Sequence, residues 1–146
     1  MMRTQIMHPE LLAGLARCGH GSKVLVADAL FPHATGAEPS VPRVQLNLSP
    51  GMVPADLVVR LLGEACHLEA AEFMADPGGP GGESPAVADY RTILADHRHA
   101  GGAELTWAPI ERMAFYEACW QREVGLVIAT GDVRPYANLL LTIGVP

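Results

Sequence analysis

Short apolar runs alternate with amphipathic stretches along this chain, which is the pattern of an α/β protein. Residues 24–27, 125–129 and 139–143 form continuous apolar runs bounded by turn-forming residues. Such runs are typical of strands buried on both faces of a mostly parallel sheet. The pattern predicts further strands at residues 43–48, 70–74 and 104–107. It predicts helices starting at Pro9 and ending at Gly19, and at residues 54–67, 86–99 and 110–122.

Two long segments lack either periodicity and are predicted to be loops. Residues 31–42 are rich in Pro, Gly, Ala and Thr, and residues 76–85 are rich in Pro and Gly. The second is not a phosphate-binding loop, because its prolines interrupt the amide donors and no Lys-Ser or Lys-Thr pair follows. We expect it to be mobile surface that, like the first loop, can shape the mouth of a nearby site.

The connection 130–138 predicts how the chain ends. It is too short for a parallel crossover and contains Gly and Pro, so the strands on either side of it are expected to be antiparallel neighbours. This places Tyr136 and Asn138 at the carboxyl end of the preceding strand. If the earlier strands are parallel to that strand, Asp28, which follows the strand at 24–27, lies at the same edge, where open α/β sheets bind ligands. We expect one rim to hold His20, Asp28, Tyr136 and Asn138.

The expected architecture is therefore a single-domain three-layer α/β/α sandwich over residues 1–146, with a mostly parallel central sheet and an antiparallel carboxy-terminal strand. The hydrophobic content is 49% with a mean hydropathy of +0.19, yet no apolar run could span a bilayer. The surplus apolar surface indicates subunit contacts. The net charge of −6 comes from scattered residues and argues against nucleic acid as a partner. The amino terminus lacks a secretory signal, so we expect a cytoplasmic protein.

Cysteine and histidine chemistry outside the rim leaves few alternatives. Cys18, Cys66 and Cys119 are widely spaced, and reduced thiols are expected. No zinc-like spacing accompanies Cys66 and its neighbour His67, so no metal site is predicted. A nucleophilic Cys18 with His20 as its base lacks an orienting third group. The histidines at positions 97 and 99 are expected at the solvated carboxyl end of a helix, with a ligand role as the alternative.

The predicted rim suits a polyhydroxylated neutral ligand. Gly19 and Gly21 leave His20 uncovered, and a histidine can move protons near neutral pH. Arg112 and Tyr116 lie one helical turn apart, so they present guanidinium donors beside a phenol. Carboxylate, amide and guanidinium groups read hydroxyls by hydrogen bonding. The structural alternative is that His20 caps a turn and Asp28 caps the next element, while Arg112 is solvated and Tyr116 is packed.

Several segments together resemble the D-ribose pyranase and L-fucose mutarotase family. They are His8-Pro9-Glu10-Leu11-Leu12, Gly19-His20-Gly21, Ala27-Asp28-Ala29-Leu30-Phe31-Pro32, Arg112-Met113-Ala114-Phe115-Tyr116-Glu117, and Thr130-Gly131 with Tyr136-Ala137-Asn138 and the closing Gly144-Val145. Their order and spacing cover nearly the whole chain. The segment at 112–117 is similar to the fucose branch, to which the chain is closer, whereas the segment at 136–138 is similar to the ribose branch.

The resemblance implies an α/β protein in a ring-shaped oligomer, commonly a decamer, with sites near subunit contacts and with no metal or cofactor. It implies an isomerase that interconverts the anomers or ring forms of a free aldose. By position, it implies that His20 transfers protons. It implies that the sugar is held by Asp28, Arg112, Tyr136 and Asn138 with the backbone at Ala137, and Tyr116 is a further candidate. The alternatives are a noncatalytic sugar-binding or transport-accessory module and an enzyme that depends on Cys18.

Overall fold

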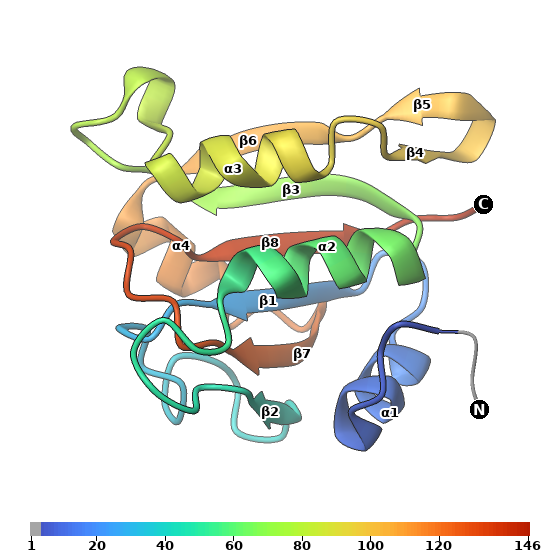
Figure 1. Ribbon diagram of the computed structural model, residues 1–146, viewed down its shortest axis with the longest axis horizontal. Helices are drawn as coiled ribbons and strands as arrows, with labels where there is room; N and C mark the ends of the chain where they lie inside the picture. The colour runs from blue at the N-terminus through green and yellow to red at the C-terminus, as the bar shows by residue number, and fades with distance from the viewer. Residues whose placement is uncertain (1–3) are drawn as a thin grey trace.

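A mixed β-sheet organises the computed structural model, which describes residues 4–146. Within these residues the sheet has six strands in the order β2-β7-β1-β8-β3-β6 (Figure 1). Their bounds are β1 (Lys23–Ala27), β2 (Arg43–Gln45), β3 (Leu68–Met74), β6 (Thr106–Ile110), β7 (Val124–Ala129) and β8 (Leu139–Ile143). Only β8 runs antiparallel to its neighbours β1 and β3. The predicted α/β fold with an antiparallel carboxy-terminal strand is confirmed.

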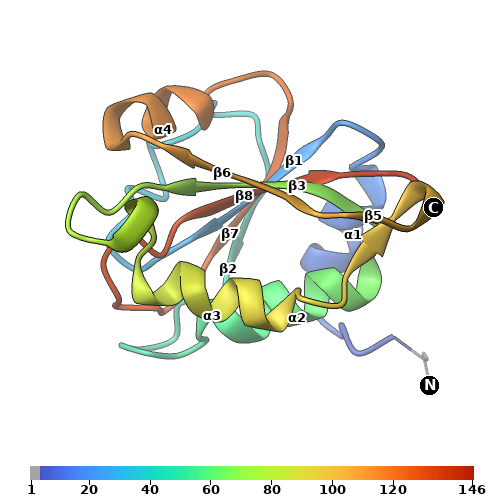
Figure 2. The ribbon, with the colours of Figure 1, turned by 90° about the horizontal axis from the view of Figure 1, so that it is seen from above.

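Helices cover both faces of this sheet and produce the predicted three layers. Their bounds are α1 (Pro9–Arg17), α2 (Ala55–Ala65), α3 (Pro85–Ile93) and α4 (Arg112–Ala118). Figure 2 shows α2 and α3 on one face and α4 on the other. A small hairpin of β4 (Arg98–His99) and β5 (Ala103–Glu104) forms a separate two-stranded sheet, and two 3-10 turns are formed by η1 (Pro80–Gly82) and η2 (Ala100–Gly102). No helix within residues 4–146 is long and apolar enough to cross a membrane.

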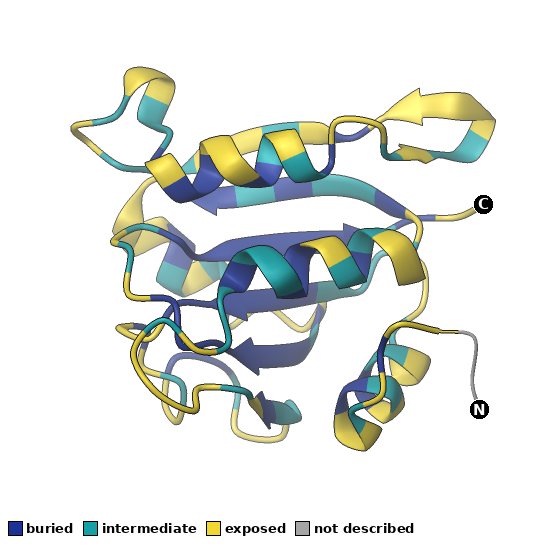
Figure 3. Cartoon of the chain, viewed as in Figure 1, coloured by how far each residue is buried: buried dark blue, intermediate teal, exposed yellow. Residues whose placement is uncertain are grey.

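The hydrophobic core has two halves, because successive side chains of a strand point to opposite faces. In β1, Val24 and Val26 pack with α2 and α3, whereas Leu25 and Ala27 pack with the side of α4. Figure 3 shows the central strands as almost entirely buried and the outer faces of the helices as exposed. This double burial explains why the central strands are continuous apolar runs in the sequence.

The order of the last strands differs from the prediction. β7 and β8 are antiparallel, but β1 lies between them, so they are not neighbours. The connection 130–138, which we call the site loop, crosses the end of β1. The Thr130 amide and hydroxyl both donate to the Ala27 carbonyl, at 2.9 and 2.8 Å, and the Ala29 amide donates to the Asp132 carbonyl at 2.7 Å. These hydrogen bonds hold the site loop against the end of β1, so that the chain passes from β7 on one side of β1 to β8 on the other.

Two element boundaries are also corrected. α3 ends at Ile93, and His97 lies beyond it, half-buried, where its Nε2 accepts from the Leu68 amide at 2.9 Å. His97 is therefore not at a solvated helix end, and burial lowers the pKa of its imidazole. His99 lies in β4, in the small hairpin. β6 extends through Pro109, and α4 begins only at Arg112; proline is tolerated there because β6 is an edge strand.

The two predicted loops are present, and β2 is shorter than predicted. Residues 28–42 contain no helix or strand, and β2 ends at Gln45 rather than at position 48. The Pro/Gly-rich segment at 76–85 folds back on itself, because the Asp76 amide donates to the Gly82 carbonyl at 2.8 Å. It includes η1, and Ser84 near its end caps the amino terminus of α3, which begins at Pro85.

Candidate active site

A cavity of about 210 Å³ opens at the carboxyl edge of the sheet, beside the end of β1 and the start of β8. Its walls bring together five of the predicted site residues with four apolar ones. They are Asp28, Arg112, Tyr116, Tyr136 and Asn138, with Leu30, Phe31, Met74 and Pro135. Four of the predicted residues come from segments more than 80 positions from Asp28 in the sequence. The apolar residues were missed, because no polar signal distinguishes a cavity wall from core.

Asp28 and Asn138 form a reciprocal pair at the base of this cavity. The Asp28 amide donates to Asn138 Oδ1 at 2.8 Å, and Asn138 Nδ2 donates to Asp28 Oδ2 at 2.8 Å. Both residues are nearly inaccessible, with 2% and 3% exposure. The pair therefore locks the first residue after β1 to the last residue before β8.

The Asp28 carboxylate also organises the surrounding backbone. Its Oδ1 accepts from the Leu30 and Phe31 amides, both at 2.9 Å, and its Oδ2 accepts from the Ala137 amide at 3.3 Å. Burial raises the pKa of this carboxyl above its ordinary value, although these amide bonds act in the opposite direction. Asp28 thus caps the turn that follows β1 rather than a helix or strand, and this capping holds two walls of the cavity in place.

The segment that carries Tyr136 adopts an unusual backbone. Tyr136 has a φ of 55°, a left-handed conformation that costs free energy for a residue with a side chain. Two side chains of the α3 region fix it from behind: Ser84 Oγ donates to the Tyr136 carbonyl at 2.9 Å, and the Tyr90 hydroxyl donates to the Ala137 carbonyl at 2.8 Å. Ala137 is fully buried, so its backbone supports the cavity from outside.

Arg112 and Tyr116 form the outer wall. The Arg112 guanidinium lies 5.9 Å from the centre of the Tyr116 ring and is exposed. Hydrogen bonding to Tyr116 raises the pKa of this guanidinium, which is charged at any working pH in any case. A second hollow of about 630 Å³ shares Arg112 and Tyr136 with the cavity and extends toward residues 75–82. The cavity is therefore open on this side.

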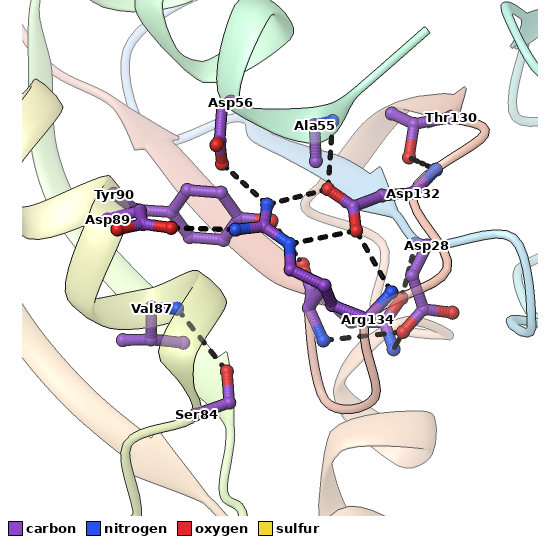
Figure 4. Close-up of polar contacts among 12 residues, drawn as sticks. Asp28, Ala55, Asp56, Ser84, Val87, Asp89, Tyr90, Thr130, Asp132 and Arg134 are labelled. Carbon is purple, nitrogen blue, oxygen red and sulfur yellow. Dashed lines mark hydrogen bonds and ion pairs between the residues drawn. The ribbon is translucent and has the colours of Figure 1, made fainter. Parts of the chain in front are cut away.

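The site loop is anchored by a second polar network, drawn in Figure 4. Asp132, only 4% exposed, accepts from the Ala55 amide at 3.2 Å and forms a two-pronged contact with Arg134. Burial by itself raises the pKa of Asp132, but the bonds from Arg134 outweigh this effect and lower it below its ordinary value. Nothing in the sequence singled out Arg134, because two of its three partners, Asp56 and Asp89, are distant in the chain.

His20 is not on this rim. It lies before β1, where the Gly21 amide donates to the Ile143 carbonyl at 2.8 Å, and its Nε2 is 3.2 Å from Glu69 Oε2. The length of β1 separates it from Asp28, roughly 13 Å for four steps along a strand. The prediction of one rim holding both residues within a chain is wrong. The histidine on the Asp28 side is His33, whose Nε2 lies 2.6 Å from the Asp28 carbonyl oxygen but does not line the cavity.

The remaining chemical alternatives receive no support from the geometry. Cys18 is at the carboxyl end of α1, and burial raises the pKa of its thiol, whereas a nucleophilic cysteine needs a lowered one. Burial also raises the pKa of Cys119 to about 12. Among residues 4–146, no three His, Cys, Asp or Glu side chains are arranged to hold a metal ion.

Comparison with known proteins matches the whole chain to one family. The model described as the RbsD / FucU transport protein family matches residues 1–146. The fucose mutarotase of Homo sapiens is 33% identical over 146 residues, which cover 96% of this chain and 90% of that protein. A D-ribose pyranase of Paracidovorax citrulli is 27% identical over 154 residues, covering 99% of this chain and 98% of that protein.

The fold is also similar to solved structures. Bacillus subtilis RbsD complexed with D-ribose aligns with a TM-score of 0.77 at 24% identity, covering 100% of this chain and 99% of that one. The arrangement of strands and helices is therefore shared along the full length.

Proposed function

Since the chain belongs to the RbsD / FucU family, we propose that it is a sugar mutarotase, an isomerase that interconverts the anomers or ring forms of a free aldose such as L-fucose. The single observation that carries this proposal is the cavity, which gathers Arg112, Tyr116, Tyr136 and Asn138 around a space of about 210 Å³. That volume is below the usual range for larger ligands and suits one monosaccharide.

The reaction requires proton transfers at two oxygens of the sugar. A base takes the proton from the anomeric hydroxyl while an acid protonates the ring oxygen, and the bond between the anomeric carbon and the ring oxygen breaks. Rotation of the resulting aldehyde and ring closure give the other anomer. A positioned acid or base contributes about 10² to 10⁴ in rate. The reaction moves protons and breaks and re-forms one C–O bond without a change of oxidation state, so we propose that no metal or redox cofactor takes part.

His20 remains the proposed proton-transferring residue, supplied by another copy of the chain. Within one chain it lies at the opposite edge of the sheet from Asn138. Its side chain contacts Glu69 but is 61% exposed, so a neighbouring copy can reach it. The hollow beside Arg112 and Tyr136 leaves the sugar cavity open to such a side chain. We therefore propose a ring-shaped oligomer, a decamer in keeping with the family resemblance, in which each site is completed at a subunit contact. We propose that this oligomer is cytoplasmic.

Asp28 takes a supporting part in this proposal. Four donors of the chain already occupy its carboxylate, about the number that two oxygens accept. We propose that it orients Asn138 and the backbone at Ala137, and that Asn138, Tyr136, Arg112 and Tyr116 contact the sugar hydroxyls.

The activity is tested by exchange NMR on equilibrated L-fucose, D-ribose and D-galactose. Magnetisation transfer between the anomeric protons is followed with and without the protein. Faster exchange for one sugar is expected and identifies the substrate. Binding without faster exchange supports the alternative of a noncatalytic sugar-binding or transport-accessory module, which one observation favours: the cavity of a single chain contains no histidine. If the protein neither binds any of these sugars nor accelerates their exchange, both the mutarotase and the sugar-binding module are contradicted.

Mixed assemblies test the proposed sharing of the site. His20→Ala and Asn138→Ala chains are each expected to be inactive alone. When the two are unfolded together and reassembled, roughly a quarter of the sites receive both native residues if they come from different copies. Activity is then regained. If both residues served the same site from one chain, no mixed site would be intact and activity would stay absent. His33→Ala is the matched histidine control and is expected to retain exchange.

A further inference from the structure

Arg134 has the densest set of ionic contacts in the described part of the chain, yet it does not line the sugar cavity. Its guanidinium contacts three carboxylates from three segments. It donates to Asp132 of its own loop at 3.0 and 2.6 Å, to Asp56 of α2 at 2.6 Å, and to Asp89 of α3 at 2.8 Å. One side chain therefore ties the site loop to both helices on that face of the sheet.

The geometry of these contacts suits fixing a position. A planar guanidinium presents its donors in a rigid fork, so partners on several sides determine its orientation as well as its place. Asp132 is 4% exposed and the Arg134 side chain is 29% exposed, so solvent screens the contact between them less than it screens a surface ion pair. The contact with Asp89, whose side chain is 59% exposed, is screened more strongly. Figure 4 shows the guanidinium between Asp56 and Asp132, with Asp89 on the other side.

Helix α3 also supports the site loop closer to the cavity, through Tyr90. The Arg134 guanidinium lies 5.9 Å from the centre of the Tyr90 ring, and the Tyr90 hydroxyl donates to the Ala137 carbonyl at 2.8 Å. Arg134 and Tyr90 thus hold the loop on both sides of Tyr136. The left-handed backbone of Tyr136 is unfavourable by itself and persists only where its surroundings impose it.

We propose that Arg134 is a positioning residue for sugar binding: it clamps the site loop to α2 and α3, and so holds Tyr136 and Asn138 at the distances that a bound sugar requires. The identity of the ligand as a sugar rests on the proposed function, whereas the clamp rests on the ion pairs of Arg134 and its contact with Tyr90. Arg134 does not touch the cavity, so its removal acts on affinity and leaves the proton transfers largely unchanged.

The test compares Arg134→Met with Arg91→Met, a matched control on the same face. Arg91 belongs to α3, pairs with Glu83 at 2.6 Å and stacks on Trp107 at 4.7 Å, without contacting the site loop. Dissociation constants for L-fucose and D-ribose are measured by ligand-observed NMR, with kcat and KM from anomer exchange. Arg134→Met is expected to raise Kd and KM about tenfold, as the loss of one or two sugar hydrogen bonds would, with kcat within about twofold. Arg91→Met is expected to change Kd less than about twofold.

Two milder variants keep the proposal testable if Arg134→Met does not fold. Tyr90→Phe removes only the hydroxyl that donates to the Ala137 carbonyl, and it is expected to raise Kd about threefold. Arg134→Lys keeps the charge without the fork and is expected to fall between wild type and Arg134→Met.

The outcomes separate the two proposals. A wild-type protein that neither binds nor exchanges any sugar overturns the proposed function. A wild-type protein that binds, with Arg134→Met or Tyr90→Phe binding equally well, overturns the clamp, whatever the fall in thermal stability. A loss of kcat at unchanged Kd also overturns it, because the loop would then act on the reaction rather than on sugar binding.

Discussion

The carboxylate of Asp28 is engaged by the chain on both oxygens, with Leu30 and Phe31 on one side and Ala137 and Asn138 on the other. An acid at the end of a parallel strand is commonly taken for a ligand-binding group. Here its contacts join the loop after β1 to the segment before β8, which are the two walls of the cavity. Asp28 therefore belongs to the site because its hydrogen bonds hold the two walls of the cavity together.

Replacing Asp28 by Asn is therefore expected to damage stability and affinity together. The amide nitrogen must face two of the four donors, so two hydrogen bonds are lost and donors oppose each other, at a cost of about 2 to 4 kcal/mol in the free energy of unfolding. Urea unfolding measures this cost, and ligand-observed NMR measures the weakened sugar binding. Asp96→Asn, at an exposed position, is the control. Equal stability of the two variants would contradict the proposed role of Asp28.

Asp132 gives a pH-dependent prediction. Its folded-state pKa lies below the ordinary value of 3.8, so its ionised form stabilises the fold above that pH, and the stabilisation is lost as the pH falls through the folded-state pKa. Asp132→Asn is expected to lower the free energy of unfolding by about 2 kcal/mol at pH 7. The difference from wild type should shrink as the pH falls below 3.8.

The measurement is urea unfolding of both proteins across this pH range. Asp28, whose pKa is raised, has the opposite sign, because its contribution to stability is lost as the pH rises past 3.8. Burial is the largest cause of that raised pKa and the charge of Asp132 is a minor one, so most of the Asp28 contribution is common to both proteins and cancels in the difference. A difference that does not change with pH would show that Asp132 acts through packing alone.

At the scale of elements, the sequence reveals local structure better than pairing. The central strands were predicted because both of their faces are buried, which leaves a continuous apolar run. The insertion of β1 between β7 and β8 was missed, because strand order depends on the distant contact between Thr130 and Ala27. The early end of α3 was missed because Leu94 packs against α2 at Gly63, and tertiary contacts override local helix propensity.

The candidate site shows the same division. The grouping of Asp28 with Tyr136 and Asn138 followed from the antiparallel last strand, and Arg112 with Tyr116 from helical spacing. The placement of His20 beside them did not hold within the chain, although the sequence contained the reason. His20 precedes β1 and Asp28 follows it, so a strand of five residues must separate them. A resemblance to a family indicates which residues belong to the site, but it does not indicate whether they come from the same copy of the chain.

Gly131 provides a prediction at the scale of the site loop. A Cβ at this position would lie 1.9 Å from the Met52 carbonyl oxygen, so the backbones cannot separate without moving the loop. Gly131→Ala is expected to lower the free energy of unfolding by about 3 kcal/mol or more. Gly19→Ala is the control, because a Cβ there meets nothing within 4 Å. Thermal and urea unfolding distinguish the two, and similar stability would contradict the close approach.

At the scale of the whole molecule, several large apolar side chains are left on the surface of one chain. Leu30, at the cavity wall, is 72% exposed, and Met113 on the adjoining helix is 63% exposed. Exposed apolar groups near a site often mark a protein interface. They support the proposal that another copy covers this side and brings His20 with it.

Activity is accordingly expected to depend on protein concentration. Exchange per chain should fall on dilution, in step with the loss of the oligomer, because a dissociated chain has no histidine at its cavity. Light scattering gives the assembly state, and exchange NMR on the same samples gives the rate. Full exchange by a sample shown to be monomeric would falsify the shared site. Leu30→Glu should produce the same loss at concentrations where the wild type is assembled.

β8 begins beside the sugar cavity and ends beside the turn that carries His20, where the Ile143 amide donates to the Ser22 carbonyl at 2.8 Å. In the proposed arrangement, each copy supplies His20 to the cavity of one neighbour and receives His20 from another neighbour at its own cavity. In an assembly that is not closed, the copy at one end has a His20 that reaches no cavity, and the copy at the other end has a cavity without a histidine. Closing the ring completes this remaining site, so the activity per chain depends on whether the ring is closed.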